Sequence, residues 1–253
     1  MKKDDPYKFE QKKINHIFHY TSVFTDLQKI IRYGFAPSYC KEEIDSVKYL
    51  SPMVSFCNIP IAEVDRYMRY GKNGIGMSLE WAIRKGVNPV LYIHRGSPYK
   101  SLASANVLNA VPENPNANRE YNFLLKSVTT QLLQNVKYWQ TEYQGDIINT
   151  YQEREWRFVP KLNNELPIVD REMHPKEYDT LTDKKESPKP HLKNYTMDIE
   201  SINDIRYIVV TSETQREKMI KTLSYRFGKD ETSDALINGK LSILTASQIR
   251  NDF

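Results

Sequence analysis

The sequence predicts an α+β protein with a mixed, mainly antiparallel sheet and flanking helices. Short segments rich in β-branched and aromatic residues recur along the chain, and amphipathic segments with helical spacing lie between them. No repeat is visible, and 253 residues are enough to bury a substantial core. We therefore expect one α+β domain over residues 1–253.

The two kinds of element alternate along the chain. The predicted strands cover residues 15–21, 52–60, 73–79, 88–95, 152–159, 204–212 and 241–246. The predicted helices cover residues 22–33, 61–71, 78–86, 119–139 and 212–228. Gly34, Gly71 and Gly228 stand where helices should end, and Ser212 can cap the last helix. The core motifs thus fall in residues 14–160, a polar insertion in 161–203, and a strand-helix-strand unit in 204–253.

Composition narrows the functional class only slightly. A formal net charge of +4, from 36 basic and 32 acidic residues, permits contact with nucleic acid but does not argue for it. No apolar run could cross a membrane and the start lacks a secretory signal, so we expect a cytoplasmic protein. Cys40 and Cys57 show no disulfide or zinc spacing and should be small buried residues.

The first motif is HYTS at residues 19–22. Strand alternation places His19 and Thr21 on one face at the end of the first strand, a common location for ligand contacts. The simpler interpretation is a histidine that ends a strand, followed by Thr21 or Ser22 as the cap of the next helix.

The second motif joins SFCNIP at 55–60 with RYGKNGIG at 69–76. Gly71, Gly74 and Gly76 allow the backbone to turn and to approach a ligand closely. Their spacing does not fit the GxGxxG dinucleotide fingerprint between a strand and a helix, so a Rossmann site is not supported. Tyr70 could stack on the aromatic ring of a ligand.

The third motif is YQEREWRFVP at 151–160. In an extended segment Glu153, Glu155 and Arg157 share one face, and Trp156 and Phe158 pack on the other with Arg154. Two carboxylates on one face repel each other unless a cation or a ligand hydroxyl offsets the repulsion. The charged face is therefore either an exposed ion pair on an edge strand or the lining of a site.

Taken in order, HYTS, YCKEE, PMVSFCNIP, YGKNGIGMSLEWA, NPVLYI and YQEREWRFVP resemble the AbiGi-type abortive-infection proteins of bacteria. The resemblance covers about residues 15–160 and the later segment IRYIVV. It implies a role in phage defence within a toxin–antitoxin operon, where this family name is linked to an antitoxin. An antitoxin and a chaperone from the same operon would then be possible partners.

The layout is also, more distantly, similar to ADP-ribosyltransferases such as the DarT-like enzymes, which modify nucleic acid. This similarity implies an ADP-ribosyltransferase-like fold that uses NAD as a substrate and needs no metal. His19 and Thr21 match the first motif, Tyr70 or Phe56 the aromatic element, and Glu155 the late-strand glutamate, whereas Ser55 matches the middle motif only in part. The implied catalytic residues are Glu155, His19 and Glu153, and the implied NAD-binding residues are Tyr20, Thr21, Ser55, Phe56, Tyr70, Gly74 and Arg157.

The chemistry fits these residue types. Cleavage of the nicotinamide glycosidic bond passes through a ribosyl cation, which a carboxylate such as Glu155 stabilises while Glu153 activates the acceptor. The leading hypothesis is an ADP-ribosyltransferase toxin acting on RNA, DNA or a translation-related target. The alternative is an antitoxin or regulatory binding protein without activity. A metal-dependent endonuclease using Glu153, Glu155 and His19 is weaker, because no third carboxylate ligand stands at a suitable spacing.

Overall fold

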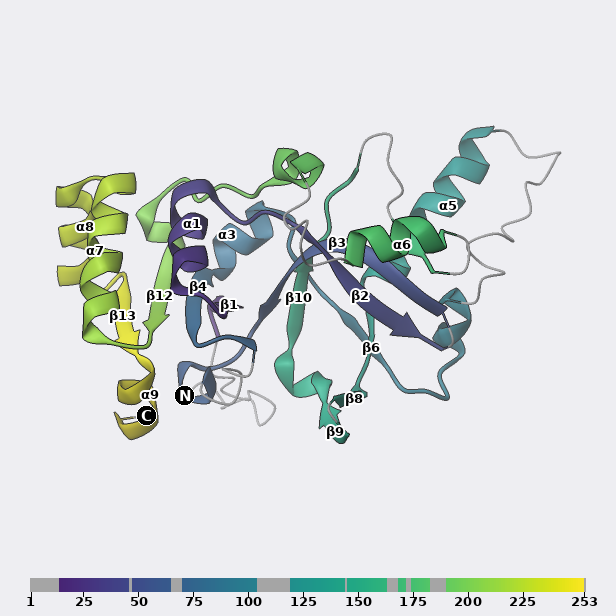
Figure 1. Cartoon of the computed structure of the whole chain (residues 1–253), viewed down its shortest axis with the longest axis horizontal. Helices are drawn as coiled ribbons and strands as arrows, with labels where there is room; N and C mark the ends of the chain where they lie inside the picture. Colours follow the sequence, from purple (N-terminus) through teal and green to yellow (C-terminus); the bar gives the residue numbers. More distant parts are fainter. Residues whose placement is uncertain are drawn as a thin grey trace, which may run out of the picture.

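In the computed structural model a mixed sheet forms the centre of the molecule (Figure 1). The structure describes residues 14–45, 47–64, 70–103, 119–143, 145–162, 168–171, 174–182 and 190–252. Seven strands of the sheet follow each other in the order β13 (Ser242–Thr245), β12 (Ile205–Val210), β4 (Asn73–Ser78), β1 (His16–Thr21), β3 (Val47–Cys57), β10 (Glu155–Phe158) and β5 (Asn88–Pro89). Two further strands, β2 (Ser38–Ile44) and β11 (Val169–Asp170), pair with β3.

The pairing of the strands is mostly antiparallel. Within the large sheet only β12 and β13 run parallel, so the predicted mixed, mainly antiparallel sheet is confirmed. Two small two-stranded sheets accompany it. One is a parallel pair of β6 (Leu91–Ile93) and β7 (Val136–Tyr138), and the other an antiparallel pair of β8 (Gln140–Tyr143) and β9 (Asp146–Asn149).

Helices flank the sheet, as the sequence predicts. The α-helices in the described part of the chain are α1 (Phe24–Tyr33), α3 (Leu79–Arg84), α5 (Arg119–Gln134), α6 (Pro175–Thr182), α7 (Glu213–Phe227), α8 (Lys229–Ile237) and α9 (Ala246–Asp252). The main hydrophobic core joins one face of the sheet to α1, α3, α7 and α8. In Figure 1 these four helices lie on the half of the molecule that holds β12 and β13, and α5 and α6 on the other half. None of the described helices is both long and apolar enough to span a bilayer.

Several predicted boundaries are confirmed by local chemistry. Helix α1 ends at Gly34, whose φ of 86° suits glycine, and a Cβ there would lie 2.3 Å from the carbonyl oxygen of Met197. The hydroxyl of Ser78 accepts a hydrogen bond from the Trp81 amide and caps α3. Ser212 caps α7 in the same way, and Gly228 follows its last residue.

Other predicted boundaries are wrong. The strand predicted at 88–95 divides into β5 and β6, which belong to different sheets. The helix predicted at 119–139 ends at Gln134, and β7 follows it. The strand predicted at 152–159 begins only at Glu155, because residues 150–153 form a 3-10 turn and Arg154 has a φ of 45°. Neither Thr21 nor Ser22 caps α1, since Val23 holds the cap position without a side-chain hydrogen bond.

The predictions for residues 61–71 and 161–203 are met only in part. Of the helix predicted at 61–71, Ile61–Glu63 is a 3-10 turn and residues 65–69 lie outside the described residues. Within the polar stretch 161–203, the described residues include β11, α6 and the 3-10 turns Pro190–Tyr195 and Ile202–Asp204. Met197, Ile199 and Ile202 from this stretch belong to the main core. More of this segment packs against the main core than its polar sequence predicted.

Candidate functional site

A buried cluster of charged side chains surrounds β10. Glu155 and Arg157 lie on one face of this strand, and both are buried. The Arg157 Nε donates a hydrogen bond to Glu155 Oε1 at 2.8 Å. Trp156 and Phe158 lie on the opposite face and pack against the main core. The predicted division of faces is confirmed for these four residues, but β10 pairs with both β3 and β5, so the ion pair is internal and does not lie on an exposed edge.

Lys137 of β7 links the two glutamates that the sequence singled out. Its Nζ lies 2.6 Å from Glu155 Oε2 and 3.0 Å from Glu153 Oε2. Glu153, although it precedes the strand, is buried and also accepts a hydrogen bond from the Tyr70 hydroxyl. Lys137 is thus the cation that contacts both glutamates, and Arg157 on the same strand face as Glu155 offsets the charge of Glu155 as well.

Arg157 extends the cluster in the other direction. Its Nη2 lies 2.9 Å from Glu42 Oε1 on β2, and its Nη1 donates to the backbone carbonyl of Gln134 at 2.8 Å. The Tyr92 hydroxyl lies 2.7 Å from the backbone nitrogen of Glu155. The charged cluster, defined here as Glu42, Lys137, Glu153, Glu155 and Arg157, therefore connects β2, β7 and β10.

Burial and ion pairing shift the titration of this cluster in opposite directions. Burial alone would raise the pKa of Glu155, but Arg157 and Lys137 outweigh it and lower that pKa to about 2. Burial raises the pKa of Glu42, and Arg157 only partly opposes this. Burial would lower the pKa of Lys137, but Glu155 and Glu153 raise it. Glu155 is consequently a firmly ionised carboxylate, and Glu42 is the member with a pKa above its ordinary value.

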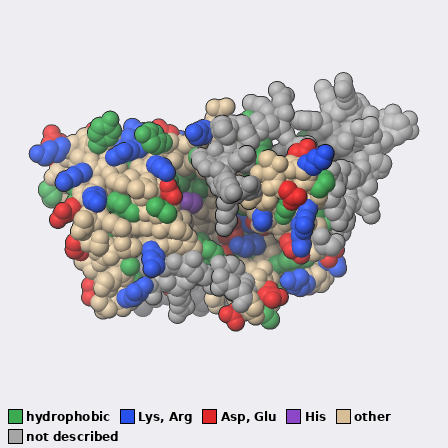
Figure 2. Space-filling model, in the orientation of Figure 1, with side chains coloured by type: hydrophobic (Ala, Val, Ile, Leu, Met, Phe, Trp, Pro, Cys, Tyr) green, Lys and Arg blue, Asp and Glu red, His purple; other side chains and the backbone are tan. Residues whose placement is uncertain are grey.

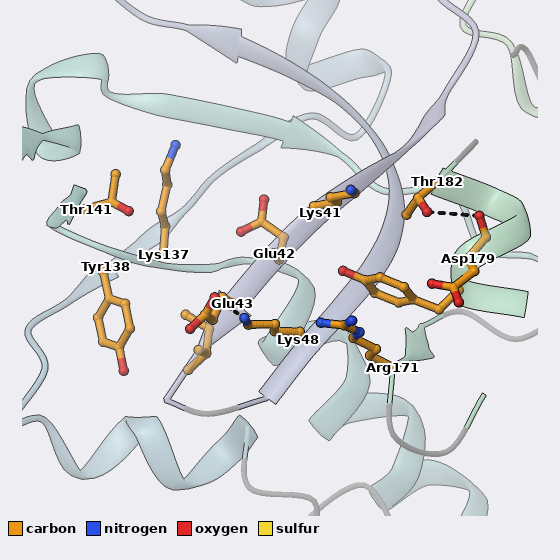
Figure 3. Close-up of a pocket in the computed structure, with 12 residues that line it drawn as sticks. Lys41, Glu42, Glu43, Lys48, Lys137, Tyr138, Thr141, Arg171, Asp179 and Thr182 are labelled. Atoms are coloured by element: carbon orange, nitrogen blue, oxygen red, sulfur yellow. Dashed lines mark hydrogen bonds and ion pairs between the residues drawn. The ribbon is translucent and has the colours of Figure 1, made fainter. Parts of the chain in front are cut away.

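A pocket of about 600 Å³ adjoins the charged cluster (Figure 3). Glu42 and Lys137 belong to both. Figure 3 shows the β2 side chains in the middle, with Lys137, Tyr138 and Thr141 on one side and Arg171, Asp179 and Thr182 on the other. The complete lining is Lys41, Glu42, Glu43, Ile44, Lys48, Lys137, Tyr138, Thr141, Arg171, Tyr178, Asp179 and Thr182. The pocket is thus strongly polar and carries both signs of charge.

Charges on the face drawn in Figure 2 are mixed. Lysine and arginine side chains are spread over it and alternate with acidic ones, and acidic and basic side chains also meet near its centre. Among the described residues on this face, no large single-sign basic area of the kind that typically binds nucleic acid is visible.

The strand register separates His19 from Glu155. Phe18 and Glu155 both pair with Cys57 of β3, so these three side chains share one face of the sheet. His19 follows Phe18 in β1 and lies on the opposite face, where its ring contacts Phe35 and Phe56. The Nδ1 of His19 donates to the Ser55 carbonyl at 2.9 Å, and burial lowers its pKa despite this hydrogen bond. The structure therefore does not bring the histidine and the glutamate together.

The remaining predicted NAD-binding residues fall into separate environments. Phe56 is buried in the main core, where it packs against Trp81. Gly74 lies opposite Tyr20, and a Cβ at Gly74 would meet the Tyr20 ring at 3.3 Å, so this glycine makes room for the ring. The Thr21 hydroxyl donates to the Val23 carbonyl.

Ser55 and Tyr70 lie nearer the charged cluster. Ser55 is half-buried and pairs with Arg157 across β3 and β10. Tyr70 reaches the cluster through Glu153. Of the ten predicted site residues, the charged cluster and its immediate partners contain Glu153, Glu155, Arg157, Tyr70 and Ser55.

The sequence reasoning missed two members of the cluster. Lys137 was assigned to the long helix, although VKYWQTEY at 136–143 is rich in aromatic and β-branched residues and is typical of a strand. Glu42 was quoted only as part of YCKEE and given no role. Among the residues that the structure describes, no three His, Cys, Asp or Glu side chains are grouped so that they could hold a metal ion.

Comparison with known proteins relates this site to a family. A family model with the description "Putative abortive phage resistance protein AbiGi, antitoxin" matches residues 34–211 of the chain. The chain belongs to the AbiGi family. The match includes all five residues of the charged cluster and the complete lining of the pocket.

A curated AbiGi relative supports the assignment. The chain is 27% identical over 260 residues to "Abortive phage resistance protein AbiGi" from Lactococcus lactis subsp. cremoris, covering 87% of this chain and 100% of the relative. No solved structure matches the chain. The resemblance to AbiGi is thus confirmed, whereas the more distant similarity to ADP-ribosyltransferases finds no support in these comparisons.

Proposed function

We propose that this AbiGi-family chain is the antitoxin of an abortive-infection pair, a binding protein that neutralises a toxin by contact. The family description names an antitoxin. The observation that carries the proposal is the state of Glu155. Both of its carboxylate oxygens are engaged, one by Arg157 and the other by Lys137, and His19 lies on the other face of the sheet. A carboxylate held in this way contributes to the fold and offers no free oxygen to a substrate.

The burial of Glu155 supports a binding protein over an enzyme. A carboxylate that stabilises a ribosyl cation must face the substrate, and a partner histidine must lie in the same cleft. In this chain the side chain of Glu155 is only 6% exposed, and Arg157 beside it is fully buried. The charged cluster therefore resembles a structural ion network more than a catalytic centre.

The alternative is an ADP-ribosyltransferase toxin that consumes NAD. One observation favours it: three residues that the resemblance to such enzymes implies lie close together, since Lys137 contacts both Glu153 and Glu155 and the Tyr70 hydroxyl donates to Glu153. In that mechanism Glu155 would have to leave Arg157 and Lys137 and turn toward the nicotinamide ribose. The carboxylate of Glu155 would then stabilise the ribosyl cation, and the ring of Tyr70 would stack on nicotinamide.

Growth assays separate the two functions. The chain is expressed alone and, in a second strain, together with the product of the gene adjacent to its own. An antitoxin leaves growth unchanged when expressed alone and restores growth in the strain that the adjacent product arrests. Growth arrest by the chain alone, with relief by Glu155→Gln, would overturn the proposal.

A biochemical arm tests the enzyme directly. Purified chain is incubated with labelled NAD and cell extract, and the Glu155→Gln variant is run beside it after circular dichroism has shown that it folds. We expect no label transfer by either protein. Transfer by the wild type that is lost in Glu155→Gln would establish the transferase and refute the antitoxin.

A further inference from the structure

The pocket follows an open strand edge. In the described part of the chain, β2 forms a ladder only with β3, in a register that runs from Ser38 opposite Met53 to Ile44 opposite Val47. Its other edge therefore carries backbone N–H and C=O groups without a ladder partner among the described residues. Such an edge is a template for an additional strand.

The pocket lining shows that this edge is accessible from both sides. Alternation puts Glu42 and Ile44 on one face of β2, and Lys41 and Glu43 on the other. All four line the pocket. Because a pocket lined from both faces of one strand must pass around its edge, the space follows the open edge of β2. Residues of β7 and β8 bound it on one face, and Arg171, which follows β11, and residues of α6 on the other (Figure 3).

The charges of the lining select what can enter. Of the pocket's cations, Lys48 lies 3.8 Å from Glu43, and Lys137 is bound to the charged cluster. No ion pair with another described residue holds Lys41 or Arg171, and both are exposed. Arg171 follows β11 in a register that puts it on the same face as Lys41, beside the ring of Tyr178.

The acidic members of the lining are mostly engaged. Glu42 is bound by Arg157, and Glu43 faces Lys48. The α6 side of the pocket therefore has two cations available for a ligand, Lys41 on β2 itself and Arg171 across β3, together with the acidic Asp179 farther along α6. Charged side chains on an edge strand discourage pairing with apolar strands. The same charges favour a strand that brings carboxylates to the α6 side.

We propose that the open edge of β2 is the docking site for an extended acidic segment of a protein partner, which adds a strand beside β2 and places a carboxylate against Lys41, with Arg171 as the more distant cation of the same pocket. Backbone hydrogen bonds would supply much of the affinity, and the two cations would supply the selectivity for an acidic segment. This inference rests on the proposed antitoxin function, because it names the surface through which the toxin would be bound.

Hydrogen exchange on the complex tests the docking directly. The probe is the adjacent-gene product that the chain neutralises in the growth assay. We expect binding to slow amide exchange in the β2 peptide 38–44, because amides on the open edge gain hydrogen-bond partners. Binding of that partner with unchanged exchange in 38–44 would overturn the inference.

Charge-reversal variants provide the second arm. Lys41→Glu should weaken partner binding by ~3- to 10-fold and the more distant Arg171→Glu by less, and both losses should be smaller at high salt. The matched control is Lys221→Glu on α7, an exposed lysine in the opposite half of the molecule, which should bind like the wild type. Equal affinity of all four proteins would overturn the inference while leaving the antitoxin function intact.

Other occupants would give different results. If the chain alone sediments as a dimer and its 38–44 amides already exchange slowly, the edge is assigned to a second copy and the proposal is overturned. Failure of the wild type to neutralise or bind the adjacent-gene product would overturn the antitoxin function and the docking site together.

Discussion

Replacing Arg157 with methionine tests how the charged cluster supports the fold. Arg157 is fully buried and pairs with Glu155 at 2.8 Å and with Glu42 at 2.9 Å. Its removal leaves the three carboxylates of the cluster, Glu42, Glu153 and Glu155, with Lys137 as the remaining cation. Removing one partner of a buried ion pair costs about 3–5 kcal/mol, because an uncompensated charge stays buried. We expect Arg157→Met to lower the free energy of unfolding by that amount at pH 7.

The pH dependence of stability reports on the combined effect of Arg157 and Lys137 on Glu155. The pKa of Glu155 falls from 4.5 to about 2 in the folded protein, which corresponds to about 3 kcal/mol of stability. Because the folded pKa is lowered, this stability is present above pH 4.5 and is lost as the pH falls toward 2. Glu42, whose pKa is raised, acts in the opposite direction and reduces the net slope.

In Arg157→Met the free energy of unfolding should depend less on pH in the acidic range. Without the guanidinium, only Lys137 still opposes the effect of burial on Glu155, so the pKa values of Glu155 and Glu42 rise relative to the wild type and protonation relieves the variant as the pH falls. The stability difference between wild type and variant should therefore shrink from pH 7 to pH 4. Adding Glu155→Gln to Arg157→Met should recover at least ~1 kcal/mol, because it removes a buried charge that has lost its main partner.

Urea denaturation followed by circular dichroism measures these differences. Lys29→Met is the control, since Lys29 forms an exposed ion pair with Asp26 and its loss should cost under ~1 kcal/mol. A cost of Arg157→Met no greater than that of the control would refute the reasoning. The reasoning would also be refuted if the loss of unfolding free energy in the double variant Arg157→Met with Glu155→Gln equalled the sum of the two single losses. Additive losses mean that the two side chains do not interact.

Three further outcomes are expected. Gly34→Ala should destabilise the fold by at least ~2 kcal/mol in urea denaturation, because a Cβ at a φ of 86° would lie 2.3 Å from the Met197 carbonyl oxygen. A variant as stable as the wild type would contradict this. Ser78→Ala should cost ~1 kcal/mol by the same assay, since the cap of α3 is lost, whereas Ser212→Ala measures the equivalent cap of α7 for comparison. Burial and the nearby Glu42 raise the pKa of Cys40 to about 11, so iodoacetamide should alkylate it slowly at pH 8 and much faster above pH 10. Rapid labelling at pH 8 would show that the thiol is not held in this environment.

Local patterns predicted the central sheet because most of its strands have strong local signals. The β1 and β12 segments are rich in aromatic or β-branched residues, and Gly34 and Gly228 mark helix ends whatever the tertiary contacts. The β2 segment was missed because its lysine and glutamates conceal the strand signal. Those charges are tolerated there because β2 has only one ladder partner among the described residues and the buried Arg157 pairs with Glu42.

The candidate site was only partly predictable, and the reason is geometric. Strand alternation correctly placed Glu155 beside Arg157, because that relation lies within one strand. The face on which His19 lies relative to Glu155 depends on the register of β1, β3 and β10, which pair residues 39 or more positions apart in the chain. The link from Glu153 to Glu155 through Lys137 depends on a helix that ends at Gln134. No local pattern specifies these long-range relations.

The charged cluster and the open edge of β2 are physically connected. Glu42 lies on the edge strand and lines the pocket, and Arg157 holds it from the buried side. Lys137 joins the opposite wall of the pocket to Glu155 in the same way. A buried ion network stabilises a fold less than an apolar core of equal volume, but it fixes the relative positions of the elements that it joins. In this chain those elements are β2, β7 and β10, and we expect the cluster to hold the two walls of the pocket, Glu42 on β2 and Lys137 on β7, at a fixed distance. Arg157→Met should consequently weaken partner binding even under conditions where the variant is fully folded, whereas Gly34→Ala, which destabilises the fold away from the pocket, should not.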